Sequence, residues 1–386
     1  MPLRLPRTAV LALVAPALLC SAAVGQAAPH AQTVAKSAVP AAPASGVPDP
    51  GSAVSVRPAA AAPAADIAQP NPGSPAKPAN AASRTLFFYT SPRSMVEMEV
   101  HTIPATNKER LQRLRENFSA ADCSADHMAE QKVVDKHGDA GVNLICVWPG
   151  GSPDMIVVAA HYEHEGQGQG ALADWSGAAL LPFLYEALQG QPRQNTYVFL
   201  ESWKRDGAET WLKSLSKTDR KHIRAMIDLD ALGLSYTRFF TTFSPFEIAP
   251  PGAIHLQAQL LWSAISDGLT QAPEQTSPHH WLSVDDTDPF RAQMIPTIVI
   301  HSVPSDSANV PGSAADIATA VNGNAYFQTY HLMCAYLTSL DHVAEKLDTR
   351  DPLWDTGPTE VEPEQETPRV TFRTFSGGRL MPPPPQ

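Results

Sequence analysis

Short apolar runs alternate with longer helical patterns through the middle of this chain. The apolar runs predict strands at residues 142–148, 155–160, 196–200, 226–230 and 295–300. The longer segments, rich in alanine and leucine, predict helices at residues 176–188, 208–215, 255–268 and 324–347. Strands and helices that alternate in this way are typical of crossover connections within a mostly parallel sheet. We therefore predict an α/β fold with three layers, α/β/α, around a central, mostly parallel mixed sheet.

This pattern is absent from both ends of the chain. Residues 1–27 have a basic start, a short apolar run and small residues, which is the layout of a secretory signal peptide. Residues 28–83 are mainly Ala, Pro, Gly and Ser, and this composition predicts a disordered linker because it buries little apolar surface. Residues 348–386 are acidic and then proline-rich, which predicts a disordered tail. The folded domain is expected at residues 84–347.

The signal predicts that the protein is exported, to the periplasm or out of the cell. Its apolar run is shorter than the roughly 20 residues that span a bilayer, so we expect no integral membrane segment after cleavage. An uncleaved signal that serves as an anchor is the alternative.

Charge argues against nucleic-acid binding, and the cysteine count limits the number of possible disulfides. The net charge is −11, with a sequence pI near 5.6, and no basic surface for nucleic acid is indicated. Three cysteines remain after the signal, Cys123, Cys146 and Cys334, so at most one intramolecular disulfide can form. Their apolar or helical surroundings favour the interpretation that they are ordinary buried residues.

Polar residues follow the predicted strands. His161, Glu163 and His164 come after the second strand, and Asp230 ends the fourth. Glu201, Glu165, Asp286 and His301 also fall at or near strand ends. Ligands of open α/β sheets bind at the carboxyl ends of the strands. We therefore expect a cleft there that takes a peptide or a small molecule.

Five segments, in the same order, resemble metallopeptidase family 28, the di-zinc aminopeptidases and their glutaminyl cyclase relatives. They lie at residues 143–163, 170–177, 195–200, 227–233 and 286–298. Within the first, a strand that leads into His161-Tyr-Glu163 is similar to the family's strand and H-x-D. Within the fourth, Ile227-Asp-Leu-Asp230 is similar to its I-N-L-D. The resemblance covers most of the predicted core and implies the zinc-exopeptidase fold.

This resemblance also implies a chemistry. The family holds two Zn²⁺ ions through His, Asp, Glu, Asp and His side chains, and a further Glu accepts the proton of the bridging water. Carried onto this chain, the resemblance implies that His161, Asp174 and Asp230 are metal ligands and that Zn²⁺ is the cofactor. Glu163 and Glu201 are the candidate catalytic carboxylates.

Several positions depart from the family pattern. Glu163 stands where the family has an Asp that orients the first His, and Asp174 is one place away from the bridging Asp, so a local shift of the turn is needed. Trp203 and Lys204 stand at the Glu-Glu pair, and Gly312 stands where the last His belongs, four residues before Asp316. Glu201, His164 or His301 are the available substitutes as ligands. Lys204 either fills the emptied metal site with its charge or is a surface lysine.

Two hypotheses follow. In the first, the protein is an aminopeptidase-type hydrolase with an altered zinc site, and it hydrolyses peptide bonds at N-termini. In the second, it is a non-catalytic relative that keeps the fold and serves as a binding module. The fold supports both equally, because a fold does not fix a function.

Overall fold

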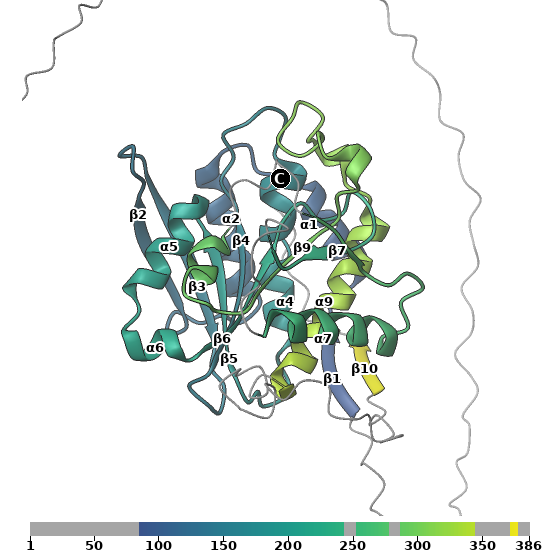
Figure 1. Cartoon of the computed structure of the whole chain (residues 1–386). Coiled ribbons are helices and arrows are strands. Elements are labelled where there is room, and N and C mark those ends of the chain that lie inside the picture. Colours follow the sequence, from purple (N-terminus) through teal and green to yellow (C-terminus); the bar gives the residue numbers. More distant parts are fainter. Residues whose placement is uncertain (1–84, 243–251, 278–285, 344–370, 377–386) are drawn as a thin grey trace, which may run out of the picture. The chain divides into compact units, whose positions relative to one another are not determined.

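The computed structural model describes residues 85–242, 252–277, 286–343 and 371–376 (Figure 1). The predicted signal peptide, the predicted linker and most of the predicted tail lie outside these residues. Among the helices of the described ranges, none is both long enough and apolar enough to cross a membrane.

A mixed sheet of eight strands forms the centre of the described domain. In spatial order its strands are β2 (Met128–Val134), β3 (Ala140–Trp148), β5 (Thr196–Ser202), β4 (Met155–His161), β6 (Ile223–Leu229), β9 (Thr297–His301), β7 (Arg238–Phe240) and β8 (Glu274–Gln275). The four central strands, β5, β4, β6 and β9, are parallel. β3 pairs antiparallel with β5 on one side, and β7 pairs antiparallel with β9 on the other. The predicted mixed, mostly parallel sheet is confirmed.

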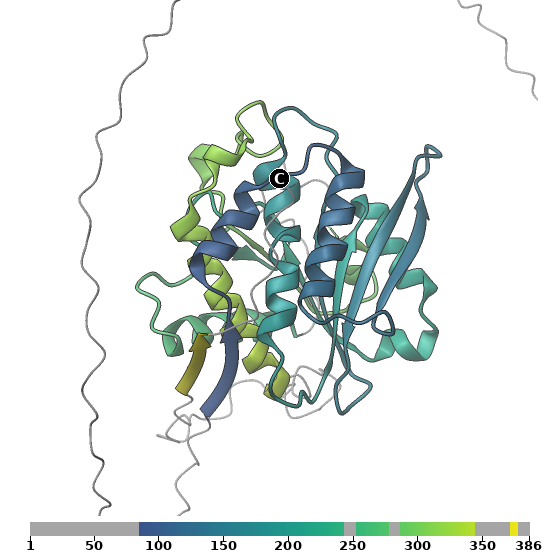
Figure 2. The same cartoon turned by 180° about the vertical axis from the view of Figure 1, so that it is seen from behind.

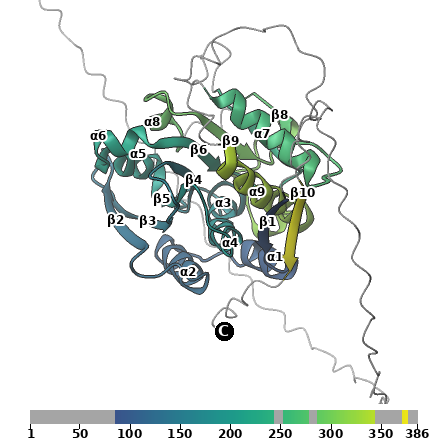
Figure 3. The ribbon, with the colours of Figure 1, turned by 90° about the horizontal axis from the view of Figure 1, so that it is seen from below.

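Helices cover both faces of this sheet. One face packs against α1 (Arg93–His101), α2 (Asn107–Ala120), α4 (Leu181–Ala187), α7 (Ala253–Ser266) and α9 (Gly323–Val343). The other packs against α5 (Lys204–Ser214) and α8 (Asp288–Arg291), and the short α6 (Lys217–Lys221) leads into β6. Figures 2 and 3 show α2, α4 and α9 on one side of the strands, with α5 and α8 on the other. The three predicted layers are therefore present.

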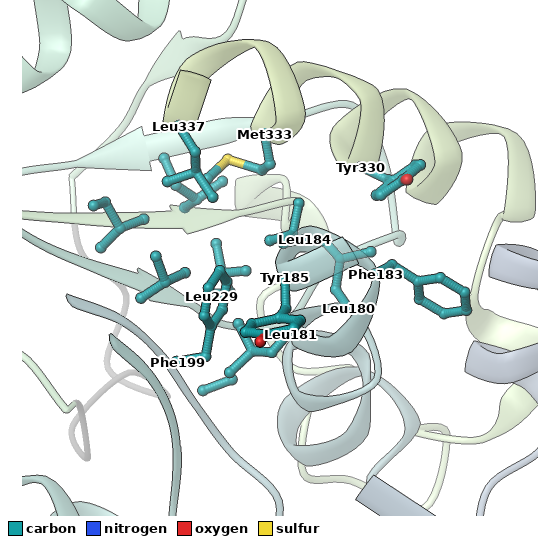
Figure 4. Packing of buried hydrophobic residues seen from close by; sticks show 14 of the residues in the cluster. Leu180, Leu181, Phe183, Leu184, Tyr185, Phe199, Leu229, Tyr330, Met333 and Leu337 are labelled. Atoms are coloured by element: carbon teal, nitrogen blue, oxygen red, sulfur yellow. The ribbon is translucent and has the colours of Figure 1, made fainter. Parts of the chain in front are cut away.

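Buried hydrophobic residues cover both faces of the central strands. β4 sends Ile156 and Val158 to the α4 side and Val157 and Ala159 to the α5 side, and all four are fully buried. Strands buried on both faces are apolar throughout rather than alternating. Figure 4 shows α4 and α9 meeting over β5 and β6, with the labelled side chains Leu184, Tyr185, Phe199, Leu229, Met333 and Leu337 packed together.

A second, two-stranded sheet joins distant parts of the sequence. β1 (Thr85–Thr90) pairs in parallel with β10 (Thr371–Ser376), in register from Thr85–Thr371 to Thr90–Ser376. The prediction of a tail without regular structure is therefore corrected at these six residues. Thr371, Phe372, Thr374 and Phe375 are of residue types that favour strands.

A disulfide between Cys123 and Cys146 ties the turn that follows α2 to β3. The two Cα atoms lie 6.4 Å apart, within the range that a disulfide bridges. The interpretation of these two cysteines as ordinary buried residues is therefore wrong, because the fold places α2 directly over β3. Cys334, in α9, is free and buried, as expected.

Candidate functional site

The parallel strands bring the predicted polar residues to one edge of the sheet. His161 is the last residue of β4 and lies in register with Ser202, the last residue of β5. Asp230 directly follows β6, and its backbone N–H donates to the carbonyl of Ile300 in β9. The carboxyl ends of neighbouring strands thus supply His161 and Asp230, as the strand-end rule predicts.

Asp174 reaches this edge from a π-helical turn at Ala171–Trp175 (π-turn). The turn starts at Gly170, which has a φ of 56° and so adopts the left-handed conformation that favours glycine. In a π-turn the hydrogen bond spans five residues instead of four, here from the N–H of Trp175 to the carbonyl of Gly170 at 2.9 Å, and this changes the direction of the side chains. Asp174 Oδ1 lies 3.6 Å from His161 Nε2. The π-turn is the local shift that the sequence comparison required of Asp174.

The buried Asp316 holds the π-turn in place. One of its carboxylate oxygens accepts from the backbone N–H of Leu172 at 2.6 Å, and the other accepts from that of Ala173 at 3.2 Å. The backbone N–H of Gly312 also donates to it, at 2.8 Å. Asp316 therefore caps the start of the turn from more than a hundred residues away. The sequence suggested no such role, because the turn itself was not predicted.

Arg110, from α2, lies beneath the same turn and is 1% exposed. Its guanidinium donates to the carbonyl oxygens of Tyr162 and Gln169, at the two ends of the loop between β4 and the π-turn. Burial lowers the pKa of Arg110, against the opposite influence of nearby Asp174 and Glu163. Sequence reasoning missed Arg110, since α2 was not predicted.

His161 is surrounded by carboxylates. Burial alone lowers its pKa, but the contact with Asp174 and the charges of Glu163 and Asp230 outweigh burial and raise the pKa well above its usual range. Burial raises the pKa of Glu163 to about 7, with the charge of Asp174 adding to the rise and that of His161 opposing it. Glu163 Oε2 accepts from the backbone N–H of Lys204 at 2.9 Å, a contact different from the one made by the family's orienting Asp.

Two further acids are buried beside these groups. Ser202 Oγ donates to Asp286 Oδ2 at 2.6 Å, and burial raises the pKa of Asp286 despite that bond and nearby His161. Glu201 is completely buried, and neither of its carboxylate oxygens has a hydrogen-bond partner within the described ranges. Burial raises the pKa of Glu201 well above its usual range, and the neighbouring Asp286 adds to this effect. Glu201 thus lies close to the site but without solvent contact.

Lys204 lies at the rim of the site rather than inside it. Its Nζ is 2.5 Å from Glu165 Oε1 and 3.7 Å from Asp135 Oδ2, and it stands 4.7 Å above the ring of Trp203. Lys204 has a φ of 56°, which is uncommon for a residue with a side chain. The lysine therefore joins the β2–β3 hairpin to the loop after β4, an arrangement that neither sequence-based interpretation anticipated.

The zinc site implied by the resemblance does not fit the side chains that are present. Both ring nitrogens of His301, one of the possible substitute ligands, have other partners: Nε2 lies 2.8 Å from Thr276 Oγ1, and Nδ1 accepts from the backbone N–H of Val303. The second oxygen of Asp174 is 2.6 Å from His164 Nδ1. Over the ranges that the structure covers, no three His, Cys, Asp or Glu side chains converge closely enough to hold a metal ion.

This chain is similar to known proteins in both sequence pattern and structure. Residues 143–344 match the model of a protein family described as Peptidase family M28. A glutaminyl cyclase from an Acidobacteriales bacterium has a similar structure, with a TM-score of 0.52 and 16% identity over 71% of this chain and 100% of that chain. An aminopeptidase from Legionella pneumophila has a TM-score of 0.52 and 13% identity over 65% of this chain and 71% of that chain.

The resemblance to other solved structures is more partial. A zinc aminopeptidase from Bacillus subtilis matches with a TM-score of 0.45 and 16% identity, and 52% of this chain covers only 50% of that chain. No curated protein sequence matches this chain. At these identities the structural likeness concerns the fold.

Proposed function

Because the chain belongs to peptidase family M28, we propose that it is an exported member of the family that binds peptides at the carboxyl edge of its sheet without di-zinc hydrolysis. The observation that carries this proposal is the set of contacts made by the Asp174 carboxylate. Both oxygens of this expected ligand face imidazoles, one from His161 and one from His164. The binding-module hypothesis is therefore favoured over the aminopeptidase hypothesis.

A peptide ligand agrees with the charge of the site. Asp174, Asp230 and Asp286 gather around His161, together with Glu163 and Glu201. A set of buried carboxylates favours a cationic group, and the free amino terminus of a peptide is such a group. The similar structures include an aminopeptidase, which supports the same class of ligand.

Export is supported by the signal-like N-terminus and by the disulfide. Disulfides form and persist mainly in oxidising compartments such as the periplasm or the cell exterior. The Cys123–Cys146 bond agrees with such a location.

A hydrolase remains the second candidate because of Glu163. A carboxylate with a pKa near 7 is suited to act as a general base at neutral pH. In that case Glu163 would accept the proton of an attacking water, and Glu163→Gln would abolish turnover while leaving peptide binding intact.

Calorimetry with short peptides tests the proposed function. We expect a peptide with a free amino terminus to bind, and its N-acetylated form to bind about tenfold more weakly, because the acetyl group removes the positive charge. Asp230→Asn should weaken binding of the free peptide, whereas Glu209→Gln, on the surface of α5, should not. Brisk cleavage of aminoacyl-anilides by protein that retains two zinc ions after dialysis would instead establish the hydrolase.

A further inference from the structure

We propose that His164 keeps this site free of metal by occupying the Asp174 oxygen that a metal ion would need. The inference deepens the proposed function and rests on it, because it explains how the family's site has been converted. It also differs from the alternative, left open by the sequence, that the charge of Lys204 fills the emptied metal site.

The first argument is that one oxygen of the Asp174 carboxylate already accepts a hydrogen bond. His164 Nδ1 lies 2.6 Å from Asp174 Oδ2, a short hydrogen bond, and His161 Nε2 lies 3.6 Å from Asp174 Oδ1. Carboxylates bind zinc at about 2.0–2.2 Å through oxygen lone pairs, and the bond from His164 uses one of those on Oδ2. A metal ion that binds Asp174 through Oδ2 must therefore compete with the His164 imidazole for that oxygen.

The second argument is that the backbone of His164 is also fixed. Its N–H donates to Asn107 Oδ1 at 2.8 Å, and Asn107 Nδ2 donates to its carbonyl at 3.3 Å. Asn107 is the first residue of α2, whose start is secured by a capping box between Thr106 and Glu109. The backbone of His164 is therefore held at the position from which its imidazole reaches Asp174.

The residue that holds the backbone of His164 lies outside the segment that matches the family. Asn107 precedes residues 143–344, which the family model matches. The element that fixes His164 is thus outside the part of the chain that carries the family pattern. The His164–Asp174 pair also lies directly against Gly170, where a Cβ atom would overlap both side chains. The backbone beneath the pair is accordingly shaped to accept it.

Lys204 has a different set of contacts. Its ammonium pairs with Glu165 and Asp135 at the rim, and its backbone N–H contacts Glu163. None of these contacts involves Asp174, whose oxygens face the imidazoles of His161 and His164. Replacing Lys204 should therefore have little effect on access to Asp174.

Zinc affinity of the full-length protein tests the proposal. It is measured at pH 7 by competition with a chromophoric chelator, using wild type, His164→Ala, Asn107→Ala, Lys204→Glu and His331→Ala. The last is a matched control, because His331 Nδ1 lies 2.6 Å from Asp267 Oδ2 in a His–Asp pair formed between α9 and the end of α7. Circular dichroism and thermal unfolding establish that each variant is folded.

We expect His164→Ala to bind Zn²⁺ about tenfold or more tightly than wild type, the scale on which contacts around a metal ligand act. Asn107→Ala should shift affinity in the same direction by a smaller factor. Lys204→Glu and His331→Ala should stay within about twofold of wild type. If His164→Ala fails to fold, the shift in Asn107→Ala decides.

Three results would overturn the inference. A loss of zinc affinity in His164→Ala would show that His164 is a ligand, and an increase confined to Lys204→Glu would identify the lysine as the excluding residue. Two tightly bound zinc ions in wild type would contradict it directly. Peptide binding is measured separately on the same proteins, so a failure of the proposed function shows in that assay, whereas a failure of this inference shows in zinc affinity.

Discussion

The two ends of strand β5 each have a buried carboxylate beside them, and their surroundings differ. At the start of the strand, Asp341 of α9 is 1% exposed and accepts from the backbone N–H groups of Gln194 and Asn195 at 2.9–3.0 Å. Its Oδ1 also accepts from Asn195 Nδ2 at 3.2 Å. Near the other end, Glu201 is fully buried, and its oxygens have no hydrogen-bond partner in the ranges described.

The difference separates a structural acid from a functional candidate. Folded proteins satisfy nearly all buried polar groups, so a carboxylate such as Asp341 adds to stability. A carboxylate such as Glu201 costs stability, and such groups cluster at functional sites. Burial alone therefore says little, and the hydrogen bonds around each acid identify its role.

The largest effect is expected from Asp341→Ala. The substitution removes three hydrogen bonds to the carboxylate, from the backbone N–H groups of Gln194 and Asn195 and from Asn195 Nδ2, and a hydrogen bond to a charged group is worth about 1.5–3 kcal/mol. We expect the free energy of unfolding in urea to fall by about 4 kcal/mol. Asp306→Ala, at an exposed position, is the control and should change it by less than about 0.5 kcal/mol.

Asp316→Ala should give the next largest effect, a loss of about 2 kcal/mol, because Asp316 accepts from Leu172, Ala173 and Gly312. This acid adjoins the candidate site but is fully satisfied, as Asp341 is. A change smaller than about 0.5 kcal/mol in the same urea experiment would show that proximity to the site, rather than hydrogen bonding, decides the role of an acid.

Glu201→Gln should have the opposite sign. Burial raises the pKa of Glu201 above the ordinary value of 4.5, so the folded protein keeps a proton that the unfolded chain has released. Stability contributed by this group therefore falls as pH rises from the ordinary pKa towards the raised one. We expect Glu201→Gln to be about 1–2 kcal/mol more stable than wild type at pH 8, and equal to it near pH 4. Urea unfolding at both pH values measures this, and a destabilised variant at pH 8 would contradict it.

The smallest effect is expected at Lys204. Lys204→Gly relieves a left-handed backbone worth about 1 kcal/mol but loses ion pairs with Asp135 and with the exposed Glu165. The net change in unfolding free energy should be below about 1 kcal/mol. Lys204→Ala keeps the strained backbone and loses the same pairs, so it should be the less stable of the two. If Lys204→Ala were instead more stable than Lys204→Gly, the left-handed backbone at residue 204 would not be strained.

The sequence predicts the central sheet better than the layers around it. Strands such as residues 155–160 are fully apolar and were recognised by that pattern, whereas α1 and α2 carry mostly polar residues and were missed. β7 and β8 have three and two residues, too few for any periodicity to show.

The site was predicted only in part, for related reasons. His161 and Asp230 follow buried strands, so their position at one edge of the sheet follows from topology. Asp174 required a π-turn, whose backbone N–H groups donate to Asp316, a residue far away in the sequence. Arg110 and Asn107 come from α2, so their contacts with the site depend on a helix that the sequence pattern did not show.

The parallel pairing of β1 and β10 has a mechanical consequence. The chain enters β1 at Thr85 and leaves β10 at Ser376, which lie at opposite ends of the pair. A force that pulls on the two flanking segments therefore acts along the strands in opposite directions and loads the hydrogen bonds of all six residue pairs together. Anchoring either flank to a surface would thus place the pair under shear, the geometry in which a short sheet resists tension best.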